Sequence, residues 1–368
     1  MNGTNKAKKF IKQSLMAIPN LIYAINTDVK SKIRLSPIEF SNRHHFKHWA
    51  SSVEWWYFTG VLRSSLRKQP IGFEITFFRI KTLFESMVLH TAITDVEKKV
   101  FYNKELVLPF NPLPLFRESE NIVHALGNSL NFNKTSNSFK IKINQRKLKI
   151  KLNLEIQDIM KQGKNGIMAM KNYPHDFSYY FSFPNLKTEG NIVFKDKAFP
   201  VSGYAWCDHQ WGNFHIRNLA WDWFSLRFDN ENIYIMIFNF KKKGSYKEKT
   251  VNITTCNLYT NSKTTQLKNI KIKAKHIFKT RGGIEYPIGW IIEIYDNKDR
   301  TLLTPIMIFD INPLTEDQHI FSYIMPSYWE GVCKVNGKIL KDVKNNKSVL
   351  LGKKELKGYA YVELVGYE

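Results

Sequence analysis

From about residue 50 onward, the sequence is a series of short apolar runs separated by polar turns. In residues 139–143 and 147–156, lysine alternates with apolar residues. A period of two places successive side chains on opposite faces of an extended strand, so these runs predict strands with an apolar inner face and a lysine-bearing outer face. No helical segments alternate with the strands, which disfavours a parallel α/β fold. The pattern predicts an all-β fold of antiparallel sandwiches or closed barrels.

The chain contains one internal echo, a short sequence motif that occurs twice. Residues 54–58 (Glu-Trp-Trp-Tyr-Phe) and 222–226 (Asp-Trp-Phe-Ser-Leu) each place an acidic residue before aromatic strand formers, and each is followed by a turn and an apolar strand. The two are too far apart for a solenoid repeat. We therefore expect two related β domains, 41–219 and 220–368, after an N-terminal lead of residues 1–40; chance similarity of a short motif is the alternative.

The composition, with 43% hydrophobic and 14% aromatic residues in 368, is that of a folded protein with a sizeable core. Three scattered cysteines are too few for a disulfide framework or a zinc module. No apolar run reaches the ~18 residues that span a bilayer as a helix. The sequence thus excludes global disorder and an integral helical membrane protein.

The charge balance is strongly basic, with 55 Lys+Arg against 32 Asp+Glu and a formal net charge of +23. Such an excess favours anionic surfaces, such as phospholipid headgroups. The lysines alternate along strands, which indicates solvated outer faces, and no nucleic-acid motif is present. We expect no nucleic-acid partner, and we expect either a simple solvated surface or association with an anionic membrane surface.

The N-terminus leaves the compartment open. Lys6, Lys8, Lys9 and Lys12 precede a mildly apolar stretch at 15–25, which resembles a signal peptide in outline. Pro19 and Asn20 interrupt that stretch, and no small-residue cleavage site follows. Cytoplasmic, exported and membrane-peripheral locations all remain compatible with this pattern.

Seven of the nine tryptophans fall in two windows, Trp49, Trp55 and Trp56, and Trp206, Trp211, Trp221 and Trp223. Large aromatic side chains line apolar cavities or fill interfaces. The clustering indicates either a ligand cavity or a Trp-rich contact between domains. In both cases we expect the two windows to meet in space.

The densest polar and aromatic cluster is residues 203–212. In an extended strand, one face would carry Tyr204, Trp206, Asp208 and Gln210, and the other Ala205, Cys207, His209 and Trp211. Asp208 would share a face with aromatic rings, where an apolar setting raises the pKa of a carboxyl and makes it a general acid. A structural carboxylate held by hydrogen bonds is the alternative.

Other polar residues are candidates to join Asp208, namely Glu54, Arg79, His90 and Asp95. A plain Glu54–Arg79 salt bridge inside a barrel is the competing interpretation. Tyr179 and Tyr180 could donate hydrogen bonds to a ligand or be ordinary strand residues.

Metal and thiol chemistry are both disfavoured. His90, Asp208 and His209 match no known metal-ligand spacing, so we expect no metal. Cys207 has Asp208 and His209 beside it, as a cysteine hydrolase would, but the alternation places Cys207 and Asp208 on opposite faces.

Several ordered segments resemble the carotenoid 1,2-hydratase (hydroxyneurosporene synthase) family, which includes the AttH-type lipocalin-like proteins. They are Glu-Trp-Trp-Tyr-Phe-Thr-Gly at 54–60, residues 72–79 and 90–95, Trp-Cys-Asp-His-Gln-Trp-Gly at 206–212, residues 221–226 and 328–331, and the ending 358–367. The resemblance extends from about residue 40 to the end of the chain.

This resemblance implies two lipocalin-like β-barrels packed in tandem, with a ligand cavity near their junction. In the hydratases no cofactor is needed: an aspartic acid protonates an isoprenoid double bond, aromatic rings stabilise the cation and water adds to it. Asp208 occupies the position of that acid, with Trp206 as the ring beside the cation. The family also includes hydratases of plant phenolics and cyclase-like proteins, so the resemblance does not fix the substrate.

We therefore expect a cofactor-free hydratase or hydrolase-like enzyme acting on an apolar isoprenoid or lipid-like ligand. Asp208 would be the acid and His209, Arg79 or Glu54 would tune it. The expected cavity residues are Trp206, Trp211, Tyr179, Trp55, Trp56, Glu54, Arg79 and Tyr204. The alternative is a lipocalin-like lipid carrier at the cell envelope that performs no chemistry.

Overall fold

The computed structural model describes residues 39–81, 85–108, 121–169, 177–214, 220–241, 253–297, 302–323, 325–345 and 348–368. The predicted N-terminal lead lies almost wholly outside these ranges. Within them the chain is all-β, with a single short 3-10 turn, η1 (Asn42–His45), as its helical element. Among the residues that the structure describes, no helix has the length and apolarity to cross a membrane.

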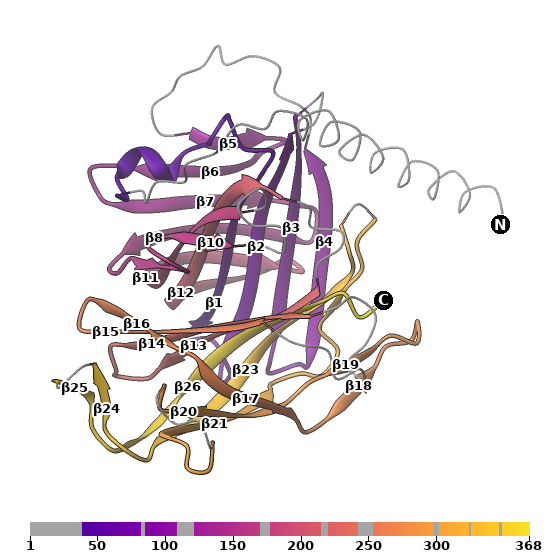
Figure 1. The fold of residues 1–368 in the computed structure, drawn as a ribbon. Coiled ribbons are helices and arrows are strands. Elements are labelled where there is room, and N and C mark those ends of the chain that lie inside the picture. Colours follow the sequence, from indigo (N-terminus) through magenta and orange to yellow (C-terminus); the bar gives the residue numbers. More distant parts are fainter. Residues whose placement is uncertain are drawn as a thin grey trace.

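The first large sheet takes up the strands of the N-terminal half and occupies the upper part of the molecule in Figure 1. Its order is β4-β3-β2-β1-β12-β11-β8-β7-β6-β5, with β9 and β10 paired to β11. The strands are β1 (Val53–Arg63), β2 (Ile71–Lys81), β3 (Glu85–Asp95), β4 (Val100–Leu108), β5 (Asn121–Ala125), β6 (Asn128–Asn133), β7 (Ser138–Asn144), β8 (Leu148–Ile156), β9 (Met160–Lys161), β10 (Ile167–Ala169), β11 (Phe177–Phe194) and β12 (Lys197–Asn213).

The second large sheet occupies the lower part of the molecule (Figure 1) and has the order β16-β15-β14-β13-β26-β23-β21-β20-β17, with β22 paired to β23. Two small hairpins, β18–β19 and β24–β25, accompany it. The strands are β13 (Ala220–Phe228), β14 (Ile233–Lys241), β15 (Ile253–Thr260), β16 (Lys263–Leu267), β17 (Asn269–Ala274), β18 (Ile277–Lys279), β19 (Glu285–Pro287), β20 (Trp290–Tyr295), β21 (Met307–Pro313), β22 (His319–Ile320), β23 (Tyr328–Ile339), β24 (Val343–Asn345), β25 (Ser348–Leu351) and β26 (Lys354–Val365).

Both sheets curl into nearly closed barrels, which confirms the predicted fold class. In each sheet the first strand pairs with the last: β1 with β12, and β13 with β26. The two echoed segments of the sequence lie in β1 and β13, so the echo has a counterpart in the topology. This pairing joins strands far apart in the chain, and the ends of the two strand orders are β4 and β5 in the first sheet and β16 and β17 in the second.

Alternation along the strands builds a separate core inside each barrel. In β2, Ile71, Phe73, Ile75 and Phe77 all belong to the first core. On β7 and β8 the apolar residues are buried and the lysines exposed, as the sequence predicted. The second barrel has its own core, with residues such as Trp290 and Trp329 fully buried.

A third apolar layer lies between the barrels. It combines residues of β1, β11 and β12 with residues of β13, β14, β23 and β26. The approach is close, because a Cβ added to Gly72 would lie 2.8 Å from a side-chain carbon of Val332 in the other barrel. This layer, formed by the outer faces of the two sheets, is where the two tryptophan windows meet, because it contains Trp55 of the first window and Trp206, Trp221 and Trp223 of the second.

Candidate functional site

Strand β12 carries polar residues on both of its faces. In the register with β1, Asp208 lies opposite Tyr57 and Gln210 opposite Trp55, while His209 lies opposite Trp56. Asp208 and Gln210, with their partners on β1, face the second barrel. His209 and Trp56 face the interior of the first barrel. The alternation along β12 agrees with the faces expected from the sequence.

The outward face of β12 borders a cavity of about 90 Å³ between the barrels. Most of its wall is aromatic: Trp55, Phe78, Phe214, Trp221, Trp223, Phe238 and Phe240, with Tyr57, Tyr180 and Tyr328. The lining carboxyls are Asp208 and Glu363, and Thr76, His90 and Gln210 are the other polar side chains. An apolar cavity of ~150 Å³ holds benzene, so this space suits the end of a chain rather than a whole polycyclic molecule.

Asp208 lies in this wall and is 2% exposed. Its Oδ1 accepts hydrogen bonds from the Ser182 hydroxyl (2.5 Å) and the Trp206 indole N–H (2.7 Å), and its Oδ2 accepts one from the Tyr180 hydroxyl. Burial raises the pKa of Asp208, and the donors offset part of that rise, leaving it at about 6. Near neutral pH this carboxyl therefore has access to both of its protonation states.

Tyr180 links Asp208 to the second barrel. Its hydroxyl donates to Asp208 and accepts the indole N–H of Trp223 at 3.1 Å. The Trp223 ring also meets the Tyr57 ring edge-on, with centroids 5.2 Å apart. The acid, the phenol and the indole thus form one hydrogen-bonded unit that spans the junction.

Three further carboxyls lie at the same junction, and two of them, Glu330 and Glu74, are fully buried. Glu363 of β26 is cross-strand from Trp223 and from Glu330. Glu330 is fully buried and accepts the Tyr57 hydroxyl at 2.7 Å, and fully buried Glu74 accepts the Thr76 hydroxyl. Burial raises all three pKa values: Glu363 to about 7, Glu74 to about 8, and Glu330 well above its usual range.

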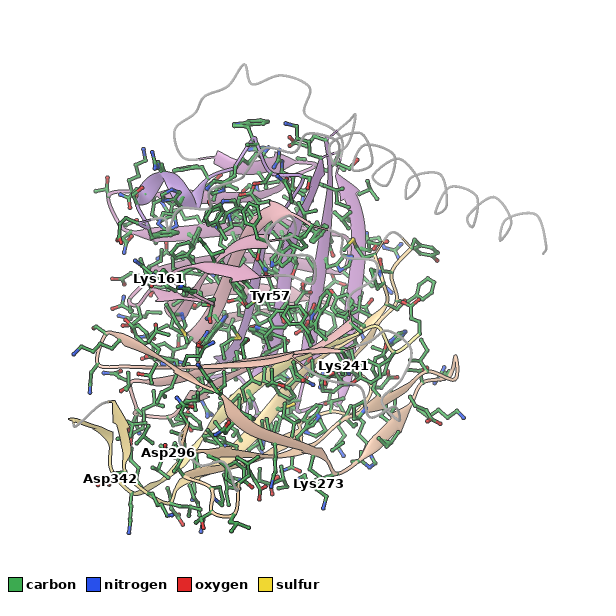
Figure 2. All side chains as sticks on the ribbon, viewed as in Figure 1. Tyr57, Lys161, Lys241, Lys273, Asp296 and Asp342 are labelled. Carbon is green, nitrogen blue, oxygen red and sulfur yellow. The ribbon has the colours of Figure 1, made fainter. Side chains whose placement is uncertain are left out.

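The polar residues of the first barrel form a continuous cross-strand row. From β11 to β4 the register aligns Ser182, Asp208, Tyr57, Thr76, His90 and Glu105. His90 bonds Tyr328 of the second barrel at 2.7 Å and Glu105 at 2.9 Å. Figure 2 labels Tyr57, which lies near the middle of the molecule in this row. The row runs along the junction from the cavity wall to the edge strand β4.

The inward face of β12 carries a different cluster, in which Glu54 binds both His209 (3.0 Å) and His48 (2.7 Å). The Arg79 guanidinium lies 3.2 Å from the other Glu54 oxygen, so the expected salt bridge is confirmed. Burial favours the neutral acid, but the histidine hydrogen bonds outweigh it and lower the pKa of Glu54 to about 2. Burial lowers the pKa of His209 to about 4, which leaves a neutral imidazole.

The structure thus separates residues that the sequence analysis placed together. Glu54, Arg79, His209, Trp56 and Trp211 belong to the inward cluster and do not join Asp208, because the odd and even positions of β1 and β12 face opposite ways. None of these five is among the described residues of the junction cavity wall.

The remaining candidates divide in the same way. Tyr179 packs against Trp211 on the inward face, and its neighbour Tyr180 is the residue that reaches Asp208. Trp206 donates an indole hydrogen bond to Asp208 but is not among the described residues of the cavity wall. Tyr204 is 43% exposed, and the Arg227 guanidinium lies over its ring. Trp55 lines the cavity as expected, His90 does so too, and Asp95 instead pairs with Arg67.

The inward cluster also bears on metal binding. His48, Glu54 and His209 present ligand atoms within 4.8 Å of one another. The carboxylate already accepts hydrogen bonds from both imidazoles, and the Arg79 guanidinium supplies the cation beside it. This donor set fits an ion-pair network. His90 and Asp208 lie on the other face from His209, so the three do not form a common site.

Cys207 does not support thiol chemistry. It is a free thiol in the core of the first barrel, on the opposite face from Asp208. Burial raises the pKa of this thiol well above its usual range, which disfavours the reactive thiolate.

Sequence reasoning missed Glu74, Glu330, Glu363 and the role of Trp223. Glu330 and Glu363 lie in the segments 328–331 and 358–367, where acids beside apolar residues are also common at exposed positions. The register of the two barrels, which no local pattern encodes, brings them to Asp208. The signal available in the sequence was only that these acids lie within unusually apolar strands.

Fold and site together define a class: a double lipocalin-like barrel with an acid-bearing aromatic cavity at the junction. The chain belongs to the AttH-like family, whose model matches residues 33–367. Among curated proteins, no sequence is significantly similar to it.

Solved structures share the fold over nearly the whole chain. An AttH protein from Nitrosomonas europaea is 22% identical with a TM-score of 0.74, covering 91% of this chain and 99% of that one. Kievitone hydratase from Nectria haematococca is 15% identical with a TM-score of 0.67, covering 90% and 93%. CghA bound to Sch210972 is 12% identical with a TM-score of 0.56, covering 92% and 96%. These likenesses establish the shared architecture.

Proposed function

We propose that this protein is a cofactor-free hydratase that adds water to a carbon–carbon double bond near the end of an apolar, isoprenoid or lipid-like chain. The observation that carries the proposal is the Asp208–Tyr180–Trp223 unit at the wall of an otherwise aromatic cavity. A carboxyl whose pKa lies at about 6 can exchange protons near neutral pH, which is the requirement for general acid–base catalysis.

The chemistry proceeds by protonation of one alkene carbon and capture of the resulting tertiary cation by water. The cation would lie against the rings of Trp223 and Trp55, where a desolvated cation–π contact is worth ~2 kcal/mol. The aromatic wall also limits the water that reaches the cation. Asp208, with Tyr180 bonded to it, is an acid–base group of this reaction.

Three observations support the reaction and the substrate class. The cavity is lined mainly by apolar rings and matches a chain end in size. The kievitone hydratase named above has the same fold. The net charge of +23 favours contact with anionic membrane surfaces, where apolar chains are found.

The test compares organic extracts of cells producing wild type or Asp208→Asn, taken from lysate and from purified protein, by mass spectrometry. Wild type should yield a species heavier by one water, and oxygen-18 water should label it. Asp208→Asn should lose turnover by about a hundredfold or more while it still binds the unhydrated compound. The matched control is Asp196→Asn, an exposed aspartate just before β12.

Two outcomes would contradict the proposal. Full turnover in a folded Asp208→Asn variant would remove Asp208 from the reaction. Recovery of one chemically unaltered lipid from wild type and variant alike would make the protein a lipocalin-like carrier, in which Asp208 only orders the cavity wall.

A further inference from the structure

Addition of water to an alkene needs two proton transfers, one to carbon and one from water. The proposed function, on which this inference rests, assigns Asp208 to the site without deciding which transfer it performs. A second carboxyl, Glu363, lines the same cavity from the opposite barrel.

The two carboxyls differ in their hydrogen bonds. Asp208 accepts three hydrogen bonds, from Tyr180, Ser182 and Trp206, and each favours the ionised form. Glu363 accepts one, from the Trp221 indole N–H at 2.6 Å, and no second donor reaches it among the described residues. One carboxyl is therefore built to hold a negative charge, and the other is left free to keep a proton.

The groups around Glu363 also favour its protonated form. Facing it across the junction and along its own sheet are the carboxyls of Asp208, Glu330 and Glu74, and the nearby phenols are those of Tyr57, Tyr180, Tyr328 and Tyr361. The imidazole of His90 also lines the cavity and bonds Tyr328 and Glu105. No lysine or arginine is among the described residues of the cavity wall. The ionised carboxylate of Asp208, with no lysine or arginine in the described wall to offset it, opposes ionisation of Glu363.

We propose that Glu363 is the second catalytic carboxyl of this cavity: it begins the cycle protonated and gives its proton to the alkene, while ionised Asp208 receives the proton of water through Tyr180. The assignment reverses the role that the sequence suggested for Asp208.

The step balances without any further reactant. The alkene π pair forms a C–H bond with the Glu363 proton, which leaves a carboxylate on Glu363 and a cation on the neighbouring carbon. A water lone pair forms the C–O bond, and the water proton passes to the Tyr180 hydroxyl as that hydroxyl gives its own proton to Asp208. Transfer of a proton from Asp208 back to Glu363 through cavity water restores the starting state.

The pKa values agree with this geometry, since burial and the Asp208 charge raise the pKa of Glu363 to about 7, above the value of about 6 for Asp208. Between those values, the state with protonated Glu363 and ionised Asp208 predominates. A pH–rate profile cannot establish the assignment, because exchanging the roles of the two groups gives the same bell shape.

The decisive experiment is an infrared titration of the folded, ligand-free protein, which detects protonated carboxyls directly. We compare wild type with Glu363→Gln, Asp208→Asn and the control Glu355→Gln, an exposed glutamate on the same strand β26. At pH 6.5 the carboxylic acid signal should fall more in Glu363→Gln than in Asp208→Asn and stay unchanged in Glu355→Gln. Glu74 and Glu330 supply a constant part of this signal, and a larger loss in Asp208→Asn than in Glu363→Gln would overturn the assignment.

Turnover then separates failure of this inference from failure of the proposed function. Glu363→Gln should lose about a hundredfold or more of the hydration rate, and Glu363→Asp should recover part of it. If wild type hydrates the extract and Glu363→Gln does so equally well, the inference fails and the hydratase stands. If wild type hydrates nothing, the proposed function fails, and Glu363 has no catalytic role whatever the infrared result.

Discussion

Asp208 and His209 are adjacent in the sequence and lie in two opposite electrostatic settings. His209 faces the inside of the first barrel, where Glu54 has two histidine donors and a guanidinium. Asp208 faces the junction, where the described cavity wall holds one other acid, Glu363, and aromatic rings but no lysine or arginine. The charges of the inward cluster are matched, so that cluster stabilises the fold. The acids at the junction lack a matching cation in the described wall, so they can keep and exchange protons.

The largest expected effect is on the inward cluster, in which the charges of Glu54 and Arg79 are matched. Arg79→Met removes the cation between Glu54 and Glu85 and leaves the fully buried Glu54 carboxylate without it, so the free energy of unfolding should fall by about 3–5 kcal/mol. Urea denaturation at pH 7 measures this loss. The control is Lys338→Met, which breaks the exposed pair with Glu355 and should change stability little. Equal, small losses in both variants would contradict a charge-matched inward cluster.

The next prediction concerns the acids at the junction between the barrels, of which Glu74 is one. The pKa of Glu74 is about 8 in the folded protein against an ordinary 4.5, so the folded state keeps a proton that the unfolded state loses. This contribution to stability is complete below pH 4.5 and is lost as the pH rises towards 8. Glu74→Gln should therefore lessen the fall in stability between pH 5 and pH 8, by roughly 2–4 kcal/mol. Denaturation at both pH values measures it.

The control for that prediction is Glu155→Gln, an exposed glutamate of β8 in the same barrel. It should leave the pH dependence as in wild type. If Glu74→Gln and Glu155→Gln give the same curve, Glu74 ionises normally and the contrast between the two faces weakens.

The smallest expected effect sharpens the contrast at a single hydrogen bond. Trp206→Phe removes the indole N–H that lies 2.7 Å from Asp208 Oδ1, and loss of a donor to the carboxylate should raise the pKa of Asp208 by up to about one unit. Infrared titration follows this shift, with Trp49→Phe, an exposed tryptophan, as the control. A pKa that does not move would show that Tyr180 and Ser182 alone hold the carboxylate.

Much of this molecule is determined locally. The period-two pattern predicts the strands and the lysine-bearing faces of β7 and β8, because side-chain direction along a strand depends only on residue parity. The same parity is enough to place Asp208 with Trp206 and Gln210 on one face of β12, and His209 with Trp211 on the other. The echo at residues 54–58 and 222–226 indicates two related β units.

What the sequence could not determine is which residues of distant strands share a face of the junction. Glu363 and Glu330 reach Asp208 only because the second barrel packs its outer face against that of the first. Glu54 and Arg79 were expected beside Asp208, yet parity on β1 turns them inward with His209. Parity is a property of one strand, whereas the partners across a sheet and across a barrel junction depend on long-range packing. The sequence by itself therefore determined the strands and the candidate acid, and only the tertiary structure decided which acids, phenols and rings surround it.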